Sequence, residues 1–496
     1  MSPTADHVIG VDLANVFDAE GEYVATLAWG DAVELVERRA TGVTIAYTTF
    51  VPDADGLPRP VRRTGVVRRG RSGAPPLAEA VVPKAEHPIL KVEFVDVQQG
   101  DASVIETPGG RVLLVDGGDN PLFARYLAAR FAGSTAEAPR PVEALLVTHG
   151  DADHFSGLVK VLEAERAPVP RQRVFLRPRR VLHNGLVKRP DSVRERDRLG
   201  PTVDYDGRVW ATGLVDDLLA VPDAELNRPF RAWKRALRTW NERSPLELVR
   251  LERGRDAPFA ELRADGVKVE VLGPLPEVVG GVPALPLLGE PRETPRIGLP
   301  SVRPPSTFTG VSAAHTINGH SVVFRLTYGK WRFLYAGDLN EQAELDLVDA
   351  HRRGEVALRA EVLKVPHHGS ADFLPEFIDA VAPVVSVVSS GDESARKEYV
   401  HPRATLVSAL GQHARGAEPL VFVTELVAFF EVVGPAVTRR GRPFFAFERR
   451  AFGLVKVRTD GERLLVWTNS GQTRLKEAYA YTLDRGRPVA VPVRRL

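Results

Sequence analysis

Four side chains that can bind a metal ion lie within one short segment, Thr148 to His154. They are His149, Asp151, Asp153 and His154. Histidine nitrogens and carboxylate oxygens, without sulfur, suit zinc, manganese or iron at an open hydrolytic site. A bound ion lowers the pKa of water to about 7, which supplies a nucleophile at neutral pH. His149 and Asp151 could share one ion and Asp153 and His154 a second, so we expect two divalent ions, zinc or manganese.

This segment is expected to be a loop between a strand and a helix. An apolar run from Val142 to Val147 precedes it, and Leu158, Val161 and Leu162 follow it at helical spacing. Side chains at such a junction can converge on an ion instead of pointing outward along a regular element. The alternative is a solvated acidic loop that contains histidines by chance, and matching residues elsewhere in the chain argue against it.

The same order of elements occurs twice in the sequence. In each half a predicted hairpin ends in an aspartate, a helix follows, and the next strand ends in a histidine. The first half comprises residues 102–107, 111–115, 122–131 and 142–147, and the second comprises 321–327, 331–336, 341–348 and 361–365. The halves end in Asp116 and His149, and in Asp338 and the pair His367 and His368. We therefore expect both sets of side chains at the same edge of two stacked sheets.

The second half is expected to complete the ligand set. Asp338 is the candidate bridge between the two ions, and His367 is the expected histidine ligand, with His368 as an alternative. His320, which lies just before a strand, is a further alternative ligand. For Asp116 we expect a supporting role, because its Asp-Gly-Gly turn precedes the ligand loop.

Catalytic and substrate contacts are expected around these ligands. Asp153 could also orient the attacking water, and His401 could protonate the leaving group or bind phosphate, or be structural. The candidate substrate-binding residues are Asn318, Ser370, Arg179, Arg180 and Trp233. The arginines could bind phosphates and Trp233 could stack on a base, or they could form a solvated helix face with its aromatics in the core. Ser370 could instead cap a helix that begins near Phe373.

Composition narrows the class of protein. The chain has 496 residues, which is too long for one ordinary domain. Its composition, 44% hydrophobic and 26% charged, is typical of a globular protein. Its formal net charge of +2 says little about nucleic acid. Cysteine is absent, which excludes disulfides, thiolate metal sites and cysteine nucleophiles. No secretory signal or membrane-length apolar run is present, so we expect a soluble, cytoplasmic protein.

The pattern along the chain predicts four parts. Residues 1–70 contain short strands and are expected to form a small β-barrel-like domain. Residues 71–88 are rich in glycine, proline and basic residues and are expected to be a linker. We predict a hydrolase domain at 89–475, with a long insertion at about 165–310, and a C-terminal extension at 476–496. A β-hairpin is expected around Asp460 and Gly461.

At these motifs the chain resembles the metallo-β-lactamase superfamily and, within it, the hydrolase domain of the ComEC competence proteins. The matching segments are 94–102, 115–118, 148–154, 318–321, 336–338, 366–370 and 399–402. The resemblance implies an α/β fold, an αββα sandwich with a metal site at one edge, and hydrolysis of phosphodiesters, DNA above all. It carries the ligand roles onto His149, Asp151, Asp153, His154, Asp338 and His367. ComEC proteins are membrane channels, so DNA uptake does not carry over to a chain without a membrane segment.

The leading hypothesis is a two-metal phosphodiesterase or nuclease in which metal-bound hydroxide attacks phosphorus in DNA or RNA. The first alternative is a hydrolase of a small ester, amide, thioester or nucleotide, because fold alone does not select the substrate. The second is a binding or assembly protein that recruits protein partners through its N-terminal domain or insertion. A full set of converging ligands argues against this last alternative. The oligomeric state stays open.

Overall fold

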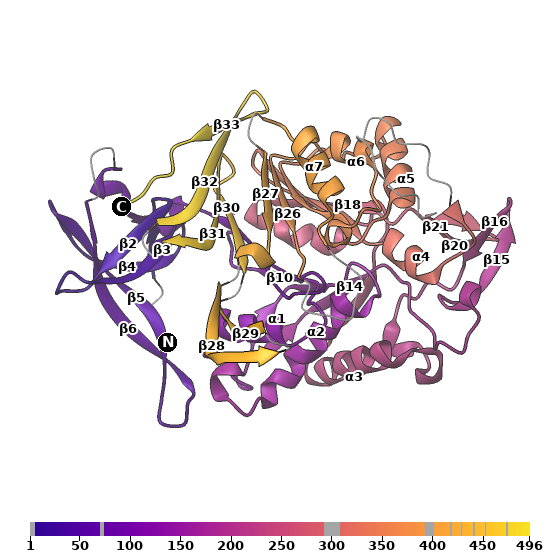
Figure 1. Cartoon of the computed structure of the whole chain (residues 1–496), viewed down its shortest axis with the longest axis horizontal. Coiled ribbons are helices and arrows are strands. Elements are labelled where there is room, and N and C mark those ends of the chain that lie inside the picture. The colour runs from indigo at the N-terminus through magenta and orange to yellow at the C-terminus, as the bar shows by residue number, and fades with distance from the viewer. Residues whose placement is uncertain are drawn as a thin grey trace.

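A computed structural model shows two facing β-sheets covered by helices, with a third, N-terminal sheet beside them (Figure 1). It describes residues 5–69, 74–291, 308–391, 401–416, 419–427, 429–439, 442–451, 453–472 and 475–496. Within these residues, no helix has the length and apolar character needed to cross a membrane.

The first sheet has ten strands and carries three helices on its outer face. Its order is β17 (Glu247–Arg250), β14 (Arg180–His183), β12 (Ala144–Leu146), β10 (Val112–Val115), β9 (Ser103–Glu106), β8 (Leu90–Val95), β30 (Leu454–Thr459), β31 (Arg463–Gln472), β32 (Leu475–Asp484) and β33 (Arg487–Val491). The helices are α1 (Leu122–Arg130), α2 (Ala152–Glu163) and α3 (Arg228–Arg243). The pairing of β30 with β31 confirms the predicted hairpin around Asp460 and Gly461.

The second sheet has six strands and its own helical cover. Its order is β18 (Val267–Gly273), β23 (Val323–Tyr328), β24 (Trp331–Tyr335), β25 (Val362–Lys364), β26 (Val385–Val388) and β27 (Leu420–Val423). The helices on this side are α4 (Ala313–Gly319), α5 (Glu341–Arg352), α6 (Pro375–Val381) and α7 (Ala404–His413). In Figure 1 the helices of the two sheets lie on opposite sides of the molecule.

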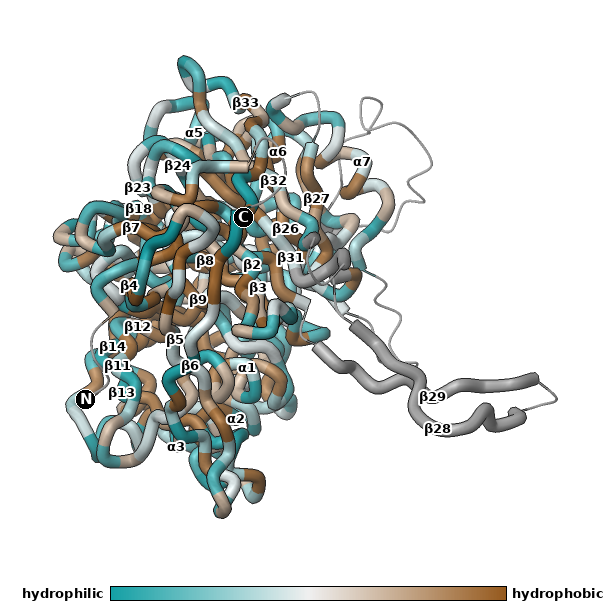
Figure 2. Tube along the Cα trace, turned by 90° about the vertical axis from the view of Figure 1, so that its left-hand side faces the viewer, coloured by the Kyte–Doolittle hydropathy of each residue, from teal (hydrophilic) through white to brown (hydrophobic). Residues whose placement is uncertain are grey.

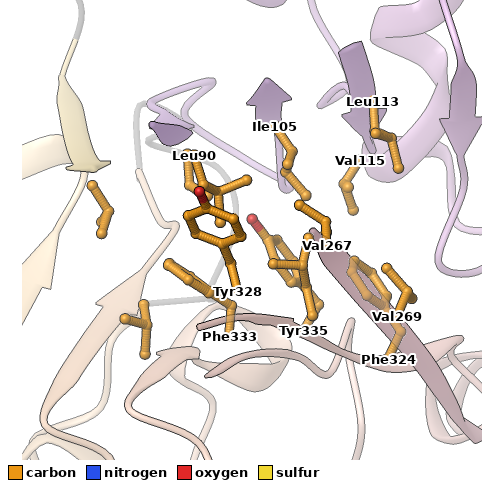
Figure 3. Close-up of a cluster of buried hydrophobic side chains, with 14 of the residues drawn as sticks. Leu90, Ile105, Leu113, Val115, Val267, Val269, Phe324, Tyr328, Phe333 and Tyr335 are labelled. Atoms are coloured by element: carbon orange, nitrogen blue, oxygen red, sulfur yellow. The ribbon is translucent and has the colours of Figure 1, made fainter. Parts of the chain in front are cut away.

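Three buried clusters account for the layers. One lies between the sheets, where side chains such as Leu90, Ile105 and Val115 face Phe324 and Tyr335 (Figure 3). A second lies between the first sheet and α1 to α3, and a third between the second sheet and α5 to α7. Strands β10 and β12 are apolar and buried along their whole length, because both of their faces are covered. Figure 2 shows hydrophobic stretches within the body of the molecule. The predicted αββα sandwich is confirmed.

The N-terminal residues form a separate seven-stranded sheet with its own core. Its order is β3 (Tyr23–Ala28), β2 (Leu13–Phe17), β6 (Pro58–Arg68), β5 (Gly42–Pro52), β4 (Ala32–Arg39), β1 (His7–Ile9) and β7 (Val81–Pro83). Among the described residues no pairing joins its outer strands, β3 and β7, so the sheet is not a closed barrel. The segment 71–88 differs from the expected linker, because β7 within it pairs with β1.

Two further parts differ from the expected division of the chain. The region 165–310 is not one inserted unit, because β14 and β17 extend the first sheet and β18 is an edge of the second. Only part of it stands apart, as a four-stranded sheet of β15 (Thr202–Tyr205), β16 (Arg208–Ala211), β20 (Val282–Pro286) and β19 (Glu277–Val279). The region 476–496 is not an extension, since β32 and β33 complete the first sheet.

Three two-stranded sheets complete the described strands. They are β11 (Arg140–Val142) with β13 (Leu176–Pro178), β21 (Glu290–Pro291) with β22 (Phe308–Thr309), and β28 (Phe429–Arg439) with β29 (Arg442–Ala451). The chain then returns to the N-terminal sheet, where the Leu496 side chain joins the buried cluster of that sheet. The backbone of Leu496 donates to the Leu13 carbonyl at 3.0 Å and accepts from the Asn15 N–H at 2.8 Å.

Candidate metal centre

The two halves of the sandwich deliver their polar residues to one edge. In the first sheet, β9 and β10 form an antiparallel hairpin and β12 lies parallel to β10. In the second sheet, β23 and β24 form the hairpin and β25 lies parallel to β24. Asp116 and His149 follow β10 and β12, and Asp338 and His368 follow β24 and β25. The carboxyl ends of such strands form a common edge, so the predicted duplication of elements is confirmed.

Three histidines face one carboxylate at this edge. Asp338 Oδ2 lies 3.1 Å from His368 Nε2, 3.3 Å from His154 Nε2 and 3.9 Å from His149 Nε2. Asp153 Oδ2 lies 3.7 Å from His368 Nε2. The side chains of His149 and His154 are fully buried, whereas that of Asp153 is 18% exposed. Ligand atoms from both sheets therefore converge on Asp338. The group around Asp338 consists of Asp338, His149, His154, His368 and Asp153, and Asp153 is its most exposed side chain.

Hydrogen bonds from Asp116, Thr148 and Ser321 hold the two histidines of the first sheet, His149 and His154. Asp116 Oδ2 lies 3.0 Å from His154 Nδ1, and its two oxygens accept from the N–H and hydroxyl of Thr148 at 2.8 Å. His149 Nδ1 lies 3.2 Å from Thr148 Oγ1 and 3.3 Å from Ser321 Oγ. Contacts to Nδ1 leave Nε2 of each ring free to face Asp338, which is how a supporting shell orients metal ligands.

His368 Nδ1 lies 3.1 Å from the Ser389 carbonyl oxygen and also close to Asp101, to which sequence reasoning assigned no role. Asp101 Oδ1 lies 3.2 Å from His368 Nδ1, and its other oxygen pairs with the buried Lys364 ammonium. The preceding residue, Gly100, has a φ of +96°, and a Cβ there would lie 1.8 Å from the Asp153 carbonyl oxygen. Only glycine permits this approach. A buried carboxylate next to such a glycine, just before a strand, is the signal that could have identified Asp101.

A strained turn separates the two adjacent histidines. In the turn Pro366–Gly369, His367 and His368 both have positive φ angles, 47° and 51°. Their rings lie 6.2 Å apart at an interplanar angle of 70°. His368 therefore faces Asp338, while the His367 ring lies 6.1 Å from the ring of His401. The expected ligand, His367, lies next to the group around Asp338 but is not part of it.

Asp151 also lies outside the group around Asp338. Its Oδ1 pairs with the ammonium of Lys188, and the Asn318 amide nitrogen donates to its Oδ2 at 3.1 Å. The other end of the Asn318 amide faces His367 Nε2 at 3.5 Å. The ammonium of Lys188 therefore contacts Asp151, the carboxylate that was expected from the sequence to bind a metal ion.

The group around Asp338 has the properties of a metal site. Among the described residues, three of its buried atoms have no hydrogen-bond partner: His154 Nε2, His368 Nε2 and Asp338 Oδ1. Leaving such atoms unpaired is costly, and a cation at this point would satisfy all three. Ligand atoms of His149, His154 and Asp338 lie within 4.8 Å of one another, as do those of Asp153, His154 and His368. The residues present fit a divalent metal ion bound by nitrogen and oxygen.

Comparison with known proteins agrees with this geometry. The family model of the metallo-beta-lactamase superfamily matches residues 95–225, which include Asp116 and the segment Thr148 to His154. The chain carries a metallo-β-lactamase superfamily domain. Among solved structures it is similar to Tm1679, a metal-dependent hydrolase of the β-lactamase superfamily, with 12% identity, a TM-score of 0.31 and coverage of 67% of this chain and 95% of that one. No curated protein matches the sequence.

Electrostatics in the metallo-β-lactamase domain favour positive charge around Asp338. Burial opposes protonation of His368, but Asp338 and Asp101 raise its pKa to about 10. Burial also opposes the charged form of Asp338, yet His368 and His154 hold its pKa well below the usual range. Burial and the neighbouring His154 keep the pKa of His149 well below its usual value. A cation is thus favoured at the centre of the group.

Two further candidates from the sequence are His401 and Ser370, and the structure shows the surroundings of each. Burial, together with His368 and His367, lowers the pKa of His401 to about 4, so its imidazole is neutral at neutral pH. Tyr399 and Val400 of the motif that precedes it lie outside the described residues. Ser370 does not cap a helix: its hydroxyl accepts from the Asp372 N–H at 3.2 Å, and the next helix begins at Pro375.

Four candidates from the sequence make other contacts and do not take the roles expected for them. His320 Nε2 contacts the Pro286 carbonyl at 2.8 Å, so it is not a ligand to the group around Asp338. Trp233 is 3% exposed and packs on Phe155 with ring centroids 6.1 Å apart, so it cannot stack on a base. Arg179 and Arg180 precede and begin β14, at the end of the sheet opposite the site. Their partners are the glutamates 143, 247 and 261.

Proposed function

We propose that the chain is a metal-dependent hydrolase that cleaves phosphodiester bonds in DNA or RNA. The observation that carries this proposal is the convergence of histidine and aspartate atoms from both sheets, with buried donor and acceptor atoms left unpaired at its centre. The superfamily match of residues 95–225 supports the hydrolase class. The nucleic-acid substrate rests on the basic residues beside the centre.

The protein's own residues orient the ligand side chains and leave room for a water molecule to enter the site. Asp116, Asp101 and Ser321 hold the ligand side chains from behind. Divalent ions bound by the group would lower the pKa of water to about 7 and stabilise developing negative charge. Asp153, hydrogen-bonded by Gln99 Nε2 at 3.4 Å, is exposed enough to accept a proton from a water molecule that enters the site. His401, neutral at neutral pH, can accept a hydrogen bond at the rim.

Basic groups close to the centre favour a phosphate-bearing substrate. Lys188 lies at Asp151, and a lysine ammonium is a compact partner for a phosphate oxygen. Helix α3 packs on the first turn of α2 through Phe230 and Phe155, whose ring centroids are 4.9 Å apart. On its exposed face α3 carries Arg228, Arg235 and Arg238. Cations along a helix beside the centre could track a polynucleotide backbone and make binding sensitive to salt.

A cleavage assay tests the proposal. Purified protein would be incubated with Mn²⁺ or Zn²⁺ and, in separate reactions, with single-stranded DNA, double-stranded DNA and RNA. We expect cleavage of at least one polymer, and its loss in Asp338→Ala and Asp153→Ala. A small chromogenic ester in a parallel reaction tests the alternative substrate class. If the ester is hydrolysed and no polymer is cut, the chain is a hydrolase but not a nuclease.

A further inference from the structure

A second charged site, which shares no residue with the metal centre, lies between the N-terminal sheet and the first sheet of the sandwich. It is a cavity of about 260 Å³. The N-terminal sheet contributes Leu13 and Thr26 to its wall, and strands β8, β30 and β31 contribute the opposite wall. On β8, Leu90 and Val92 face the core between the sheets. The alternate residues, Lys91 and Glu93, therefore face the cavity.

The cavity contains more positive than negative charge. The cations in its wall are Lys91, Arg130, Lys456, Arg458 and Lys476, and the carboxylates are Asp31 and Glu93. Glu106, just behind the wall, adds one more carboxylate through its contact with Lys91 at 3.1 Å. Even with Lys476 left aside, four cations share these three carboxylates. A surplus of cations in an enclosed site is unfavourable unless an anion compensates it.

The pairings leave Lys456 without a close ion pair, because Glu93, which lies opposite it on β8, pairs with Arg130. Arg458 pairs with Asp31 at 2.7 Å, and Arg130 pairs with Glu93 at 3.1 Å. Among the described residues no carboxylate lies within ion-pair distance of Lys456, whose ammonium lies 6.0 Å from the Trp467 ring centroid. Burial lowers the pKa of Lys456, which is what an incompletely compensated ammonium experiences.

Strand register places one pair of like charges and one pair of opposite charges across from each other at the same cavity. In the antiparallel pair of β8 and β30, Lys91 lies directly opposite Arg458, and Lys456 lies directly opposite Glu93. Like charges in such cross-strand pairs are destabilising. Lys456 is opposite Trp467 on the next strand, and the Arg458 guanidinium lies 5.0 Å from the centroid of the same ring. The indole therefore has two cations over it, and an anion could bridge them.

We propose that this cavity binds a small phosphate-bearing anion between the N-terminal sheet and the catalytic domain. Lys456 and Arg458 contact the anion, and Trp467 forms the floor of the site. A volume of about 260 Å³ admits inorganic phosphate, pyrophosphate or a small phosphate ester. Because both domains line the cavity, the anion strengthens their attachment. The site is independent of the metal centre and does not rest on the proposed hydrolase activity.

Calorimetric titration of the full chain tests the site. Inorganic phosphate, pyrophosphate and adenosine monophosphate would be titrated at constant ionic strength, with chloride as the reference anion. We expect saturable binding of at least one of them, weakened at least tenfold in Lys456→Gln and retained in Lys456→Arg. Lys268→Gln, which removes an exposed lysine outside the cavity, should leave binding unchanged. Binding in Asp338→Ala should match that of the unaltered chain.

Fluorescence provides a readout that a merely structural role of Lys456 would not give. An anion that draws two cations from the Trp467 ring should change indole emission, and Trp467→Phe should lose this change while the heat of binding remains. Circular dichroism would verify that each variant folds. Absence of saturable binding would overturn the proposal, as would binding that Asp338→Ala abolishes and Lys456→Gln retains. A fluorescence change that persists in Trp467→Phe would overturn it as well.

Discussion

The carboxylate of Asp116 and the imidazole of His154 form the contact on which the geometry of the metal centre depends. Asp116 Oδ2 lies 3.0 Å from His154 Nδ1, and the opposite ring nitrogen then lies 3.3 Å from Asp338 Oδ2. Asp116 is itself fixed by two hydrogen bonds from Thr148. A residue from outside the group around Asp338 therefore determines where a ligand atom of that group lies.

Replacing Asp116 should weaken metal binding without removing a ligand. We expect Asp116→Asn to lower the affinity for Zn²⁺ about 10- to 100-fold, because the His154 ring loses its orienting acceptor. Competition with a chromogenic chelator measures this affinity. Asp349→Asn, an exposed change on α5, serves as the matched control. An affinity equal to that of the unaltered chain would show that Asp116 does not position His154.

The two adjacent histidines should differ in their contribution to metal binding. His368 lies 3.1 Å from Asp338, whereas His367 lies beside His401 at the rim. We expect His368→Ala to lose bound metal and His367→Ala to retain most of it. Metal analysis of both proteins after identical purification gives the comparison. Equal loss in both variants would mean that His367 moves into the group when the ion binds.

Removing Lys188 should strengthen the binding of a second metal ion. Its ammonium occupies Asp151 and adds positive charge beside His149. We expect Lys188→Ala to bind the second equivalent of Mn²⁺ several-fold more tightly, because Asp151 is freed and a like charge is removed. Isothermal titration resolves the two equivalents. Asp151→Ala should abolish the gain, and a second equivalent that binds more weakly in Lys188→Ala would contradict this role.

The stability of the chain should fall in acid partly through Glu106. Burial opposes its charged form, but Lys91 and Arg130 lower its pKa from 4.5 to about 2. A depressed pKa in the folded state gives stability that is present above pH 4.5 and is lost as the pH falls toward 2. Glu106→Gln should therefore reduce the free energy of unfolding by up to about 3 kcal/mol at pH 7, and by much less at pH 3. Urea unfolding at both pH values measures the difference, and an equal loss at pH 3 would be inconsistent with this linkage.

Leu496 should stabilise the N-terminal sheet. Its side chain is 7% exposed and lies in the cluster with Val16 and Ile45. We expect Leu496→Ala to cost about 2 kcal/mol or more, as for other buried leucines. Thermal unfolding measures the loss, and an exposed leucine on α5, Leu345, provides the control substitution. Equal effects of the two substitutions would argue against this packing.

Sequence periodicity predicted the duplicated hairpins and two stacked sheets, because these depend on local patterns, and the family resemblance implied the αββα sandwich. The choice between His367 and His368 was not accessible in this way. It depends on two successive residues with positive φ, which orient neighbouring rings differently. The contacts of Asp151 with Lys188 and of Asp101 with Lys364 join distant segments, and no local pattern records them. Trp233 shows the same limit, because an aromatic among charges can lie on the buried face of a helix as well as on the exposed one.

The return of the chain to its first sheet has a consequence for synthesis. Asp12 accepts from the backbone N–H of Arg494 across 482 positions of sequence. The N-terminal sheet leaves the ribosome first, yet its core lacks Leu496 until the whole catalytic domain has been made. Ribosome-bound chains that end before Arg494 therefore hold an N-terminal sheet with an open core, and that sheet becomes complete only after the sandwich has emerged.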